Sequence, residues 1–305
     1  MKNPPLGILA ILTASTVWGL SGLFYKALAH VPPLEVLAHR TLWSLLFFGI
    51  ILGFRGRLGA VLVALKSRRT VVALALAAVM ISLNWGGYIT SIQLEYALEA
   101  SLGYYFFPLM VVLLGALFMG ERFSHGQGLA LVLMAAAVAV LTFGLGAPPW
   151  IALFLASTFS IYALIKKQVS AGPMVSVFIE VLLLAPLAMV WLYGAHRFGW
   201  STVPRPAGWF GSSWHDTVLL MLTGPMTAGP LLLFSFAAQR VRLSTLGLIQ
   251  YLNPTLQFSV AALVFAEPVT RWHAIALPII WAALALYYLE TKRRESSAPK
   301  PQRGG

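Results

Sequence analysis

Long apolar runs separated by short polar gaps fill most of the chain. Each run is close to the roughly 20 residues that an α-helix needs to cross a lipid bilayer. The first run lacks a small-residue cleavage site, so it is predicted to be a mature helix and not a signal peptide. The pattern predicts ten membrane-spanning helices, at about 7–28, 33–53, 70–92, 98–119, 127–146, 149–166, 173–194, 216–238, 243–266 and 272–290.

One stretch of the chain recurs at a fixed distance. Residues 98–121 return 146 positions later as residues 244–267 with a tyrosine, a proline and a closing glutamate in register: Tyr105 with Tyr251, Pro108 with Pro254, and Glu121 with Glu267. Such a repeat indicates two halves of one plan, here residues 1–147 and 148–290. Five spans per half is an odd number, so the second half must enter the membrane from the opposite side. We therefore predict an all-α membrane protein of two inverted five-helix repeats, an architecture typical of transporters.

The composition agrees with a membrane protein. Hydrophobic residues make up 59% of the chain and charged residues 10%, and the mean hydropathy is +0.82, which is outside the range of soluble domains. The chain has no cysteine, so disulfides, cysteine-ligated metals and thiol catalysis are excluded. The net charge of +12 does not indicate nucleic-acid binding, because the basic residues lie in short clusters between apolar runs.

These clusters alternate along the chain and predict its orientation. Lysines and arginines follow the second, fourth, sixth, eighth and tenth spans, whereas the other connections hold few of them. By the positive-inside rule both termini are cytoplasmic. The long connection over about 194–216, which carries three tryptophans, is expected at the outer interface. The tail at 291–305 is expected to be disordered.

Ionisable residues that fall inside predicted spans include Lys26, His39, Arg40, Glu99 and Glu180. Charged groups in a bilayer persist where they face the bundle interior, a water-filled cavity or one another. Arg40 and Glu99 both belong to the outer half and are predicted partners, as a structural ion pair or in substrate or proton handling. Glu180 has no obvious basic partner at its depth, so it is either a proton carrier or a member of an interhelical hydrogen bond.

Pro108 and Pro254 each remove a backbone hydrogen bond at matching places in the two halves, which in transporters often indicates a hinge or a binding site. Amides and aromatic rings near them would line a pocket for an amphiphilic organic molecule. The alternative is that the aromatic residues form interfacial belts or simply pack. The predicted lining residues are Trp18, Asn84, Trp85, Tyr88, Tyr105, Tyr162, Gln250, Tyr251 and Asn253.

Several chemistries lack their sequence patterns. The chain has no GxxxxGK[ST] phosphate loop, no histidine pair at metal-binding spacing and no GxSxG nucleophile elbow, so ATP hydrolysis, a metal centre and a cofactor are not expected. An intramembrane enzyme acting on a lipid-soluble substrate is the alternative to a transporter. It would need catalytic groups that converge at one depth, which the scattered charges do not supply.

Specific motifs resemble a known family. LEASLGY at 98–104, GERF at 120–123 and RLSTLG at 242–247, with His39-Arg40 and Asn84-Trp85, are similar to the RarD group of the EamA family in the drug/metabolite transporter superfamily. The resemblance covers nearly the whole chain to about residue 288. It implies ten helices in two inverted repeats, the bacterial inner membrane, and export of small organic compounds such as amino acids or chloramphenicol-like drugs.

Together these observations predict a secondary transporter that works by alternating access and is not an enzyme. The expected cavity is lined by spans 1, 3, 4, 6, 8 and 9, with Arg40 holding either the fold or an anionic group of the substrate. The expected partners are a small-molecule substrate and the lipid bilayer. Proton coupling, the direction of transport and the oligomeric state stay open.

Overall fold

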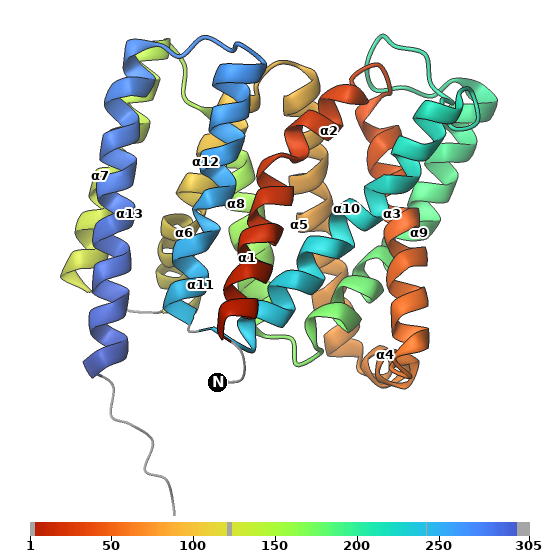
Figure 1. Cartoon of the computed structure of the whole chain (residues 1–305), viewed down its shortest axis with the longest axis horizontal. Coiled ribbons are helices and arrows are strands. Elements are labelled where there is room, and N and C mark those ends of the chain that lie inside the picture. The colour runs from red at the N-terminus through yellow and green to blue at the C-terminus, as the bar shows by residue number, and fades with distance from the viewer. Residues whose placement is uncertain (1–3, 121–123, 242, 298–305) are drawn as a thin grey trace, which may run out of the picture.

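The computed structural model describes residues 4–120, 124–241 and 243–297, and in these ranges it contains helices and no strand (Figure 1). The helices are α1 (Pro4–Gly19), α2 (Ser21–Ala27), α3 (Pro33–Phe54), α4 (Leu58–Lys66), α5 (Arg68–Gln93), α6 (Ala97–Met119), α7 (His125–Leu145), α8 (Trp150–Lys167), α9 (Pro173–Phe198), α10 (Trp214–Ala238), α11 (Leu243–Gln250), α12 (Leu252–Ser259), the π-helix η1 (Val260–Val264) and α13 (Arg271–Ser297).

The predicted all-α membrane fold is confirmed. Within the described ranges, nine segments are long and apolar enough to cross a membrane. They correspond to nine of the ten predicted spans, and the short helix α4 lies in the basic gap between the second and third of them. The arrangement of ten helices as two inverted repeats stays a prediction.

The ninth predicted span, at 243–266, is interrupted. Helix α11 ends at Gln250, and the chain continues as α12 and then as the π-helix η1. The proline ring of Pro254 clashes with the carbonyl four residues earlier, that of Gln250, and Pro254 has no N–H to donate to it. Helix α6, by contrast, continues through Pro108. The two matching prolines therefore have different local effects.

The helices pack in reciprocal pairs. Helix α8 packs against α6 and α5, and in the same way α1 packs against α12 and α10. The pairs α3 with α9 and α7 with α13 complete the bundle. Glycines allow the closest approaches: a Cβ atom on Gly224 of α10 would lie 2.6 Å from the Trp43 backbone of α3, and one on Gly103 of α6 would lie 2.8 Å from the Ala152 carbonyl of α8.

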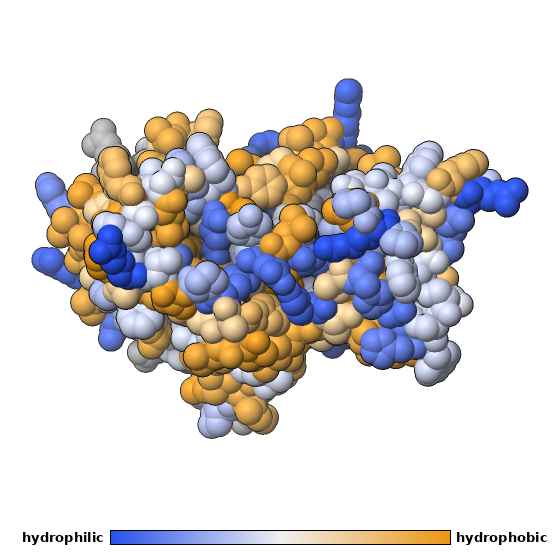
Figure 2. All heavy atoms as spheres, turned by 90° about the horizontal axis from the view of Figure 1, so that it is seen from above, coloured by the Kyte–Doolittle hydropathy of each residue, from blue (hydrophilic) through white to orange (hydrophobic). Residues whose placement is uncertain are grey.

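Both ends of the described chain lie on the same side of the bundle, together with α4 (Figure 1). That side carries the arginines and lysines that flank α4 and those at the end of α13. Helix α13 extends to Ser297, so it includes residues 291–297 of the tail that was predicted to be disordered, whereas 298–305 lie outside the described residues. Figure 2 shows the opposite face, where hydrophilic side chains gather across the middle and apolar side chains dominate much of the rim.

Candidate functional site

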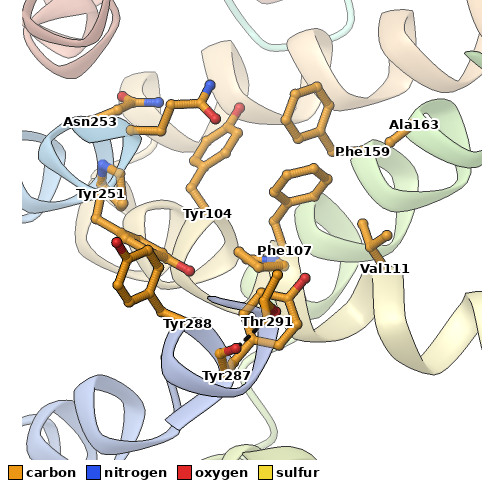
Figure 3. Close-up of a pocket in the computed structure, with 13 residues that line it drawn as sticks. Tyr104, Phe107, Val111, Phe159, Ala163, Tyr251, Asn253, Tyr287, Tyr288 and Thr291 are labelled. Atoms are coloured by element: carbon orange, nitrogen blue, oxygen red, sulfur yellow. Dashed lines mark hydrogen bonds between the residues drawn. The ribbon is translucent and has the colours of Figure 1, made fainter. Parts of the chain in front are cut away.

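A cavity of about 350 Å³ lies where α6, α8, α11, α12 and α13 meet (Figure 3). Aromatic residues are the most common type in its walls, and two amide side chains add polar groups. The lining residues are Tyr104, Phe107, Pro108, Val111, Phe159, Ala163, Gln250, Tyr251, Asn253, Pro254, Tyr287, Tyr288 and Thr291. A concave, largely apolar site with a few placed polar groups is typical of binding sites for small organic molecules.

The two repeat-related prolines both border this cavity. In each case the residue four positions earlier, Tyr104 or Gln250, loses the backbone hydrogen bond that its carbonyl would accept in a regular helix. Both of these residues line the same cavity. In both halves, a backbone carbonyl that lacks its usual helical hydrogen bond therefore lies beside a space that an organic molecule can occupy. Irregular backbone is tolerated in membrane proteins at such places.

The polar group behind the aromatic wall is Asn84 of α5. Its amide donates to the Leu155 carbonyl at 2.9 Å and to the Thr158 hydroxyl at 3.1 Å, and its carbonyl oxygen accepts from the Tyr104 hydroxyl at 3.2 Å. Asn84 is 1% exposed and does not line the cavity. It joins α5 to α8 and fixes the ring of Tyr104.

Glu180 does have a basic partner, so the expectation that it lacks one is wrong. Its carboxylate lies 2.5 Å from the Lys166 ammonium and accepts a hydrogen bond from the Tyr162 hydroxyl at 3.2 Å, while Lys166 also contacts Ser176. The partner was missed because Lys166 ends its helix, and its long side chain reaches back to the depth of Glu180. The Tyr162 ring stacks on the cavity residue Phe159 at 6.0 Å between centroids, so this pair lies directly behind the cavity wall.

Arg40 and Glu99 are not partners, contrary to the prediction. Glu99 accepts a hydrogen bond from the Ile151 amide at 2.8 Å, at the start of α8. Backbone N–H groups at a helix N-terminus are strong competitors for a carboxylate. Arg40 instead donates to the Tyr25 hydroxyl at 2.8 Å and lies 3.9 Å from the ring centroid of Trp85.

The other predicted residues lie around this polar interior. His39 is buried and stacks on Phe210 at 4.9 Å between centroids. Tyr88 packs edge-on between Tyr25 and Tyr104. Tyr105 is buried and bonds the Thr255 hydroxyl at 2.8 Å. Trp18 is half-buried near Phe234.

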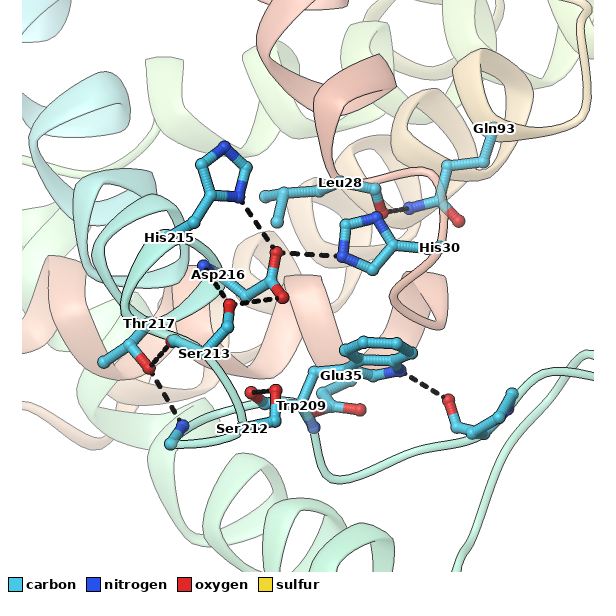
Figure 4. Close-up of polar contacts among 12 residues, drawn as sticks. Leu28, His30, Glu35, Gln93, Trp209, Ser212, Ser213, His215, Asp216 and Thr217 are labelled. Atoms are coloured by element: carbon cyan, nitrogen blue, oxygen red, sulfur yellow. Dashed lines mark hydrogen bonds and ion pairs between the residues drawn. The ribbon is translucent and has the colours of Figure 1, made fainter.

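The buried carboxylates Glu35 and Asp216 lie near the connection between α9 and α10 (Figure 4). This end of the bundle lies away from the chain termini (Figure 1). Glu35 is fully buried and accepts from the Gly208 and Trp209 amides at 2.9 and 2.7 Å, so it fixes the connection between α9 and α10 onto α3. In the same connection, Arg205 donates to the Ala29 carbonyl at 2.5 Å. Sequence reasoning predicted this connection at the outer interface but missed its attachment to Glu35.

Two further contacts strengthen the same end. Glu267 accepts from the Ala97 and Leu98 amides at 2.8 and 2.7 Å and so caps α6. Asp216 lies 2.9 Å from His30 and accepts from the Ser213 hydroxyl at 2.7 Å. Glu121, the repeat mate of Glu267, lies outside the described residues. We refer to the contacts of Glu35, Arg205, Asp216 and Glu267 as the outer clamp, after the orientation that the positive-inside rule predicts.

The structure brings together five of the predicted residues at the cavity: Pro108, Pro254, Gln250, Tyr251 and Asn253. It places Trp18, Asn84, Trp85, Tyr88, Tyr105 and Tyr162 outside the lining. Among the missed lining residues, Tyr287, Tyr288 and Thr291 lie at the end of the tenth predicted span or just beyond it. They precede a basic cluster and resemble an interfacial belt. Phe159 has no polar signal. Only the packing of α13 and α8 against α6 and α11 shows that these residues face the cavity. Among the described residues, no group of three histidine or acidic side chains gathers as metal ligands would.

Comparison with known proteins identifies the family. Residues 5–143 match the EamA-like transporter family. The chain is 42% identical to Protein RarD of Streptomyces exfoliatus, covering 96% of this chain and 94% of that protein. It is 36% identical to Protein RarD of Salmonella typhimurium, covering 95% and 96%. One crystal structure of a protein with 19% identity has the same fold, with a TM-score of 0.60 over 94% of this chain and 98% of that chain. The chain therefore belongs to the EamA-like transporter family of the drug/metabolite transporter superfamily and is similar to RarD proteins over nearly its whole length.

Proposed function

We propose that this protein is a secondary transporter of small amphiphilic organic molecules, working mainly as an exporter from the bacterial cytoplasm. The observation that carries the proposal is the aromatic cavity at the two repeat-related prolines. Its size suits a metabolite or a drug fragment, and its six aromatic side chains with two amides suit a molecule that has both an apolar ring and polar groups. A bare ion would find few charged or closely spaced oxygen ligands there.

The reciprocal packing of the helices supports two inverted repeats. If α1 with α2 begins the first half and α8 begins the second, exchanging the halves converts the α6–α8 pair into the α12–α1 pair. The same exchange converts α5–α8 into α10–α1, and it leaves α3–α9 and α7–α13 unchanged. An arrangement related by such an exchange can adopt two states of equal construction that open to opposite faces.

We infer that the described conformation faces the cytoplasm. By the positive-inside rule, the side with both chain ends and the basic residues around α4 is cytoplasmic. The cavity lining extends to Thr291 near the end of α13 on that side, while the outer clamp holds the opposite end closed. The change to an outward-facing conformation then requires the contacts of the outer clamp to separate. It also requires the chain to bend at the break between α11 and α12, so that the cavity closes on the cytoplasmic side.

We infer that the Lys166 and Glu180 pair is the place where a proton would act, if transport is proton-coupled. The pair is buried behind Phe159, and its charge state would change the position of Tyr162 against the cavity wall. A structural role for the same pair gives no dependence of transport on the pH gradient.

The test is uptake into liposomes that contain the purified protein. A panel of radiolabelled amino acids and chloramphenicol is measured with and without an imposed pH gradient. Saturable flux in the wild type that falls strongly in Gln250→Ala supports the transporter and its cavity. Flux that depends on the gradient in the wild type, but not in Glu180→Gln, adds proton coupling. The absence of protein-dependent flux for every compound contradicts the proposal.

A further inference from the structure

Arg40 is a buried cation that has no anion beside it among the residues that the structure describes. Its side chain is 6% exposed, its only hydrogen bond is to the Tyr25 hydroxyl, and its Nε atom has no hydrogen-bond partner among the described residues. A guanidinium keeps its charge in proteins. Burying such a charge without a counter-ion is costly, so buried charges are normally paired.

The carboxylates that could neutralise Arg40 are all engaged elsewhere. On the same helix, Glu35 binds two amides of the connection between α9 and α10. Glu99 caps α8, Glu267 caps α6, and Glu180 pairs with Lys166. Within the described ranges, no carboxylate forms an ion pair with Arg40. The ring of Trp85 and the hydroxyl of Tyr25 stabilise the cation only in part, because neither carries a negative charge.

A second unpartnered polar group lies one helical turn away. The Ser44 hydroxyl is fully buried and has no hydrogen-bond partner among the described residues. Residues 40 and 44 are four apart on α3, so their side chains share one face of the helix. A guanidinium with a nearby hydroxyl is the donor set that recognises a carboxylate.

A continuous row of rings joins Arg40 to the cavity. Tyr25, which bonds Arg40, packs against Tyr88 at 6.1 Å between centroids, and Tyr88 packs against Tyr104 at 5.7 Å. Tyr104 lines the cavity. Arg40 itself does not line the cavity, so the carboxylate of a molecule in the cavity reaches the guanidinium only when this row of rings moves aside.

From this arrangement we propose that the transported molecule is an organic anion, and that Arg40 with Ser44 binds its carboxylate. The inference rests on the proposed transport function and narrows the substrate to aromatic or amphiphilic carboxylates. It gives the unpaired charge of Arg40 a role that a purely structural arginine would lack, because the substrate carboxylate neutralises this charge when it is bound.

The test compares two probes that differ only in charge. N-acetyl-L-tryptophan carries a carboxylate, and N-acetyl-L-tryptophanamide is its neutral counterpart. Binding is measured by the rise in thermal stability of the purified full-length protein with each probe, and uptake is measured in phosphatidylcholine liposomes. We expect the wild type to bind the acid about tenfold or more tightly than the amide, since hydrogen bonds to charged groups are the stronger ones.

Three variants show which residues cause the preference for the acid over the amide. Arg40→Gln should bind acid and amide equally, with affinity for the amide unchanged. Arg40→Lys keeps the charge without the forked geometry and should retain part of the preference. Ser44→Ala should weaken acid binding several-fold and leave the amide unaffected, which keeps the test informative if Arg40→Gln fails to fold.

The outcomes distinguish the role of Arg40 in carboxylate binding, a lipid-binding site and a failure of the transport function. Equal binding of the two probes by the wild type, or an acid preference that survives in both Arg40→Gln and Ser44→Ala, overturns the role of Arg40 while leaving transport intact. Acid preference that is present in phosphatidylcholine vesicles but is lost when phosphatidylglycerol is added assigns the site to an anionic lipid headgroup and also overturns it. Binding and uptake of neither these probes nor the wider panel overturns the transport function itself.

Discussion

The buried ion pair between Lys166 and Glu180 gives the sharpest prediction about stability. The ammonium and the carboxylate are 2.5 Å apart, and their side chains are 20% and 1% exposed. Removing one partner of a buried pair leaves an uncompensated charge, which costs about 3–5 kcal/mol. Lys166 retains some exposure, so we expect Glu180→Gln to lower the free energy of unfolding by about 3 kcal/mol, at the low end of that range.

The double variant separates a paired charge from two independent ones. Lys166→Met leaves Glu180 without its cation and should cost about as much as Glu180→Gln. Removing both charges together leaves neither of them unpaired. The double variant should therefore be more stable than the sum of the single effects predicts, by about 2–3 kcal/mol of coupling.

Thermal unfolding of the purified proteins in one detergent provides the measurement. With about 2 °C per kcal/mol for a chain of this size, Glu180→Gln should lower Tm by about 6 °C. Glu95→Gln is the matched control, because it breaks the exposed pair with Lys26, in which Glu95 is 76% exposed, and exposed pairs contribute about 1 kcal/mol at most. Strictly additive single effects, or a loss for Glu180→Gln no larger than for Glu95→Gln, would refute the reasoning.

Three further predictions concern the cavity and the helix contacts. Gln250→Ala should reduce liposome uptake with a Tm close to that of the wild type. Asn84→Ala removes three buried hydrogen bonds and should lower the yield of folded protein and its stability, the latter by about 2 kcal/mol or more. Reduced uptake with an unchanged Tm for Asn84→Ala, and a lowered Tm for Gln250→Ala, would place Asn84 in the site. Gly224→Ala should destabilise by about 1–3 kcal/mol because its Cβ would meet the backbone of α3 at 2.6 Å, while Gly229→Ala on the same helix has nothing within 4 Å and should be neutral or slightly stabilising; equal Tm values for the two variants would contradict this packing. Glu267→Gln should lower Tm through a loss of about 1–3 kcal/mol, because an amide group replaces the carboxylate that accepts from two N–H groups at the start of α6, and an unchanged Tm would show that this cap contributes little.

Much of this protein is determined by local sequence properties. The length and spacing of the apolar runs determine where helices cross the membrane, because the bilayer requires about 20 apolar residues and leaves no unpaired backbone groups. The proline at 254 weakens the helix locally, since it cannot donate and its ring clashes with the preceding turn, but local sequence does not decide whether the helix is interrupted, because α6 continues through the matching Pro108. The motifs that resemble the EamA family are equally local, and comparison with known proteins confirmed the family.

The tertiary structure alone decided which polar groups meet. Glu99 and Arg40 are at a similar depth in the sequence pattern, yet Glu99 faces the start of α8 and Arg40 faces two aromatic rings. Depth gives one coordinate of a side chain, whereas a contact also depends on the rotation of each helix and on which helices are neighbours. Lys166 shows the same limit, because a long flexible side chain ends several ångströms from its own backbone. Tyr287 and Phe159 entered the cavity only when α13 and α8 packed beside α6 and α11, since long-range packing sets the facing of a helix that is apolar on all sides.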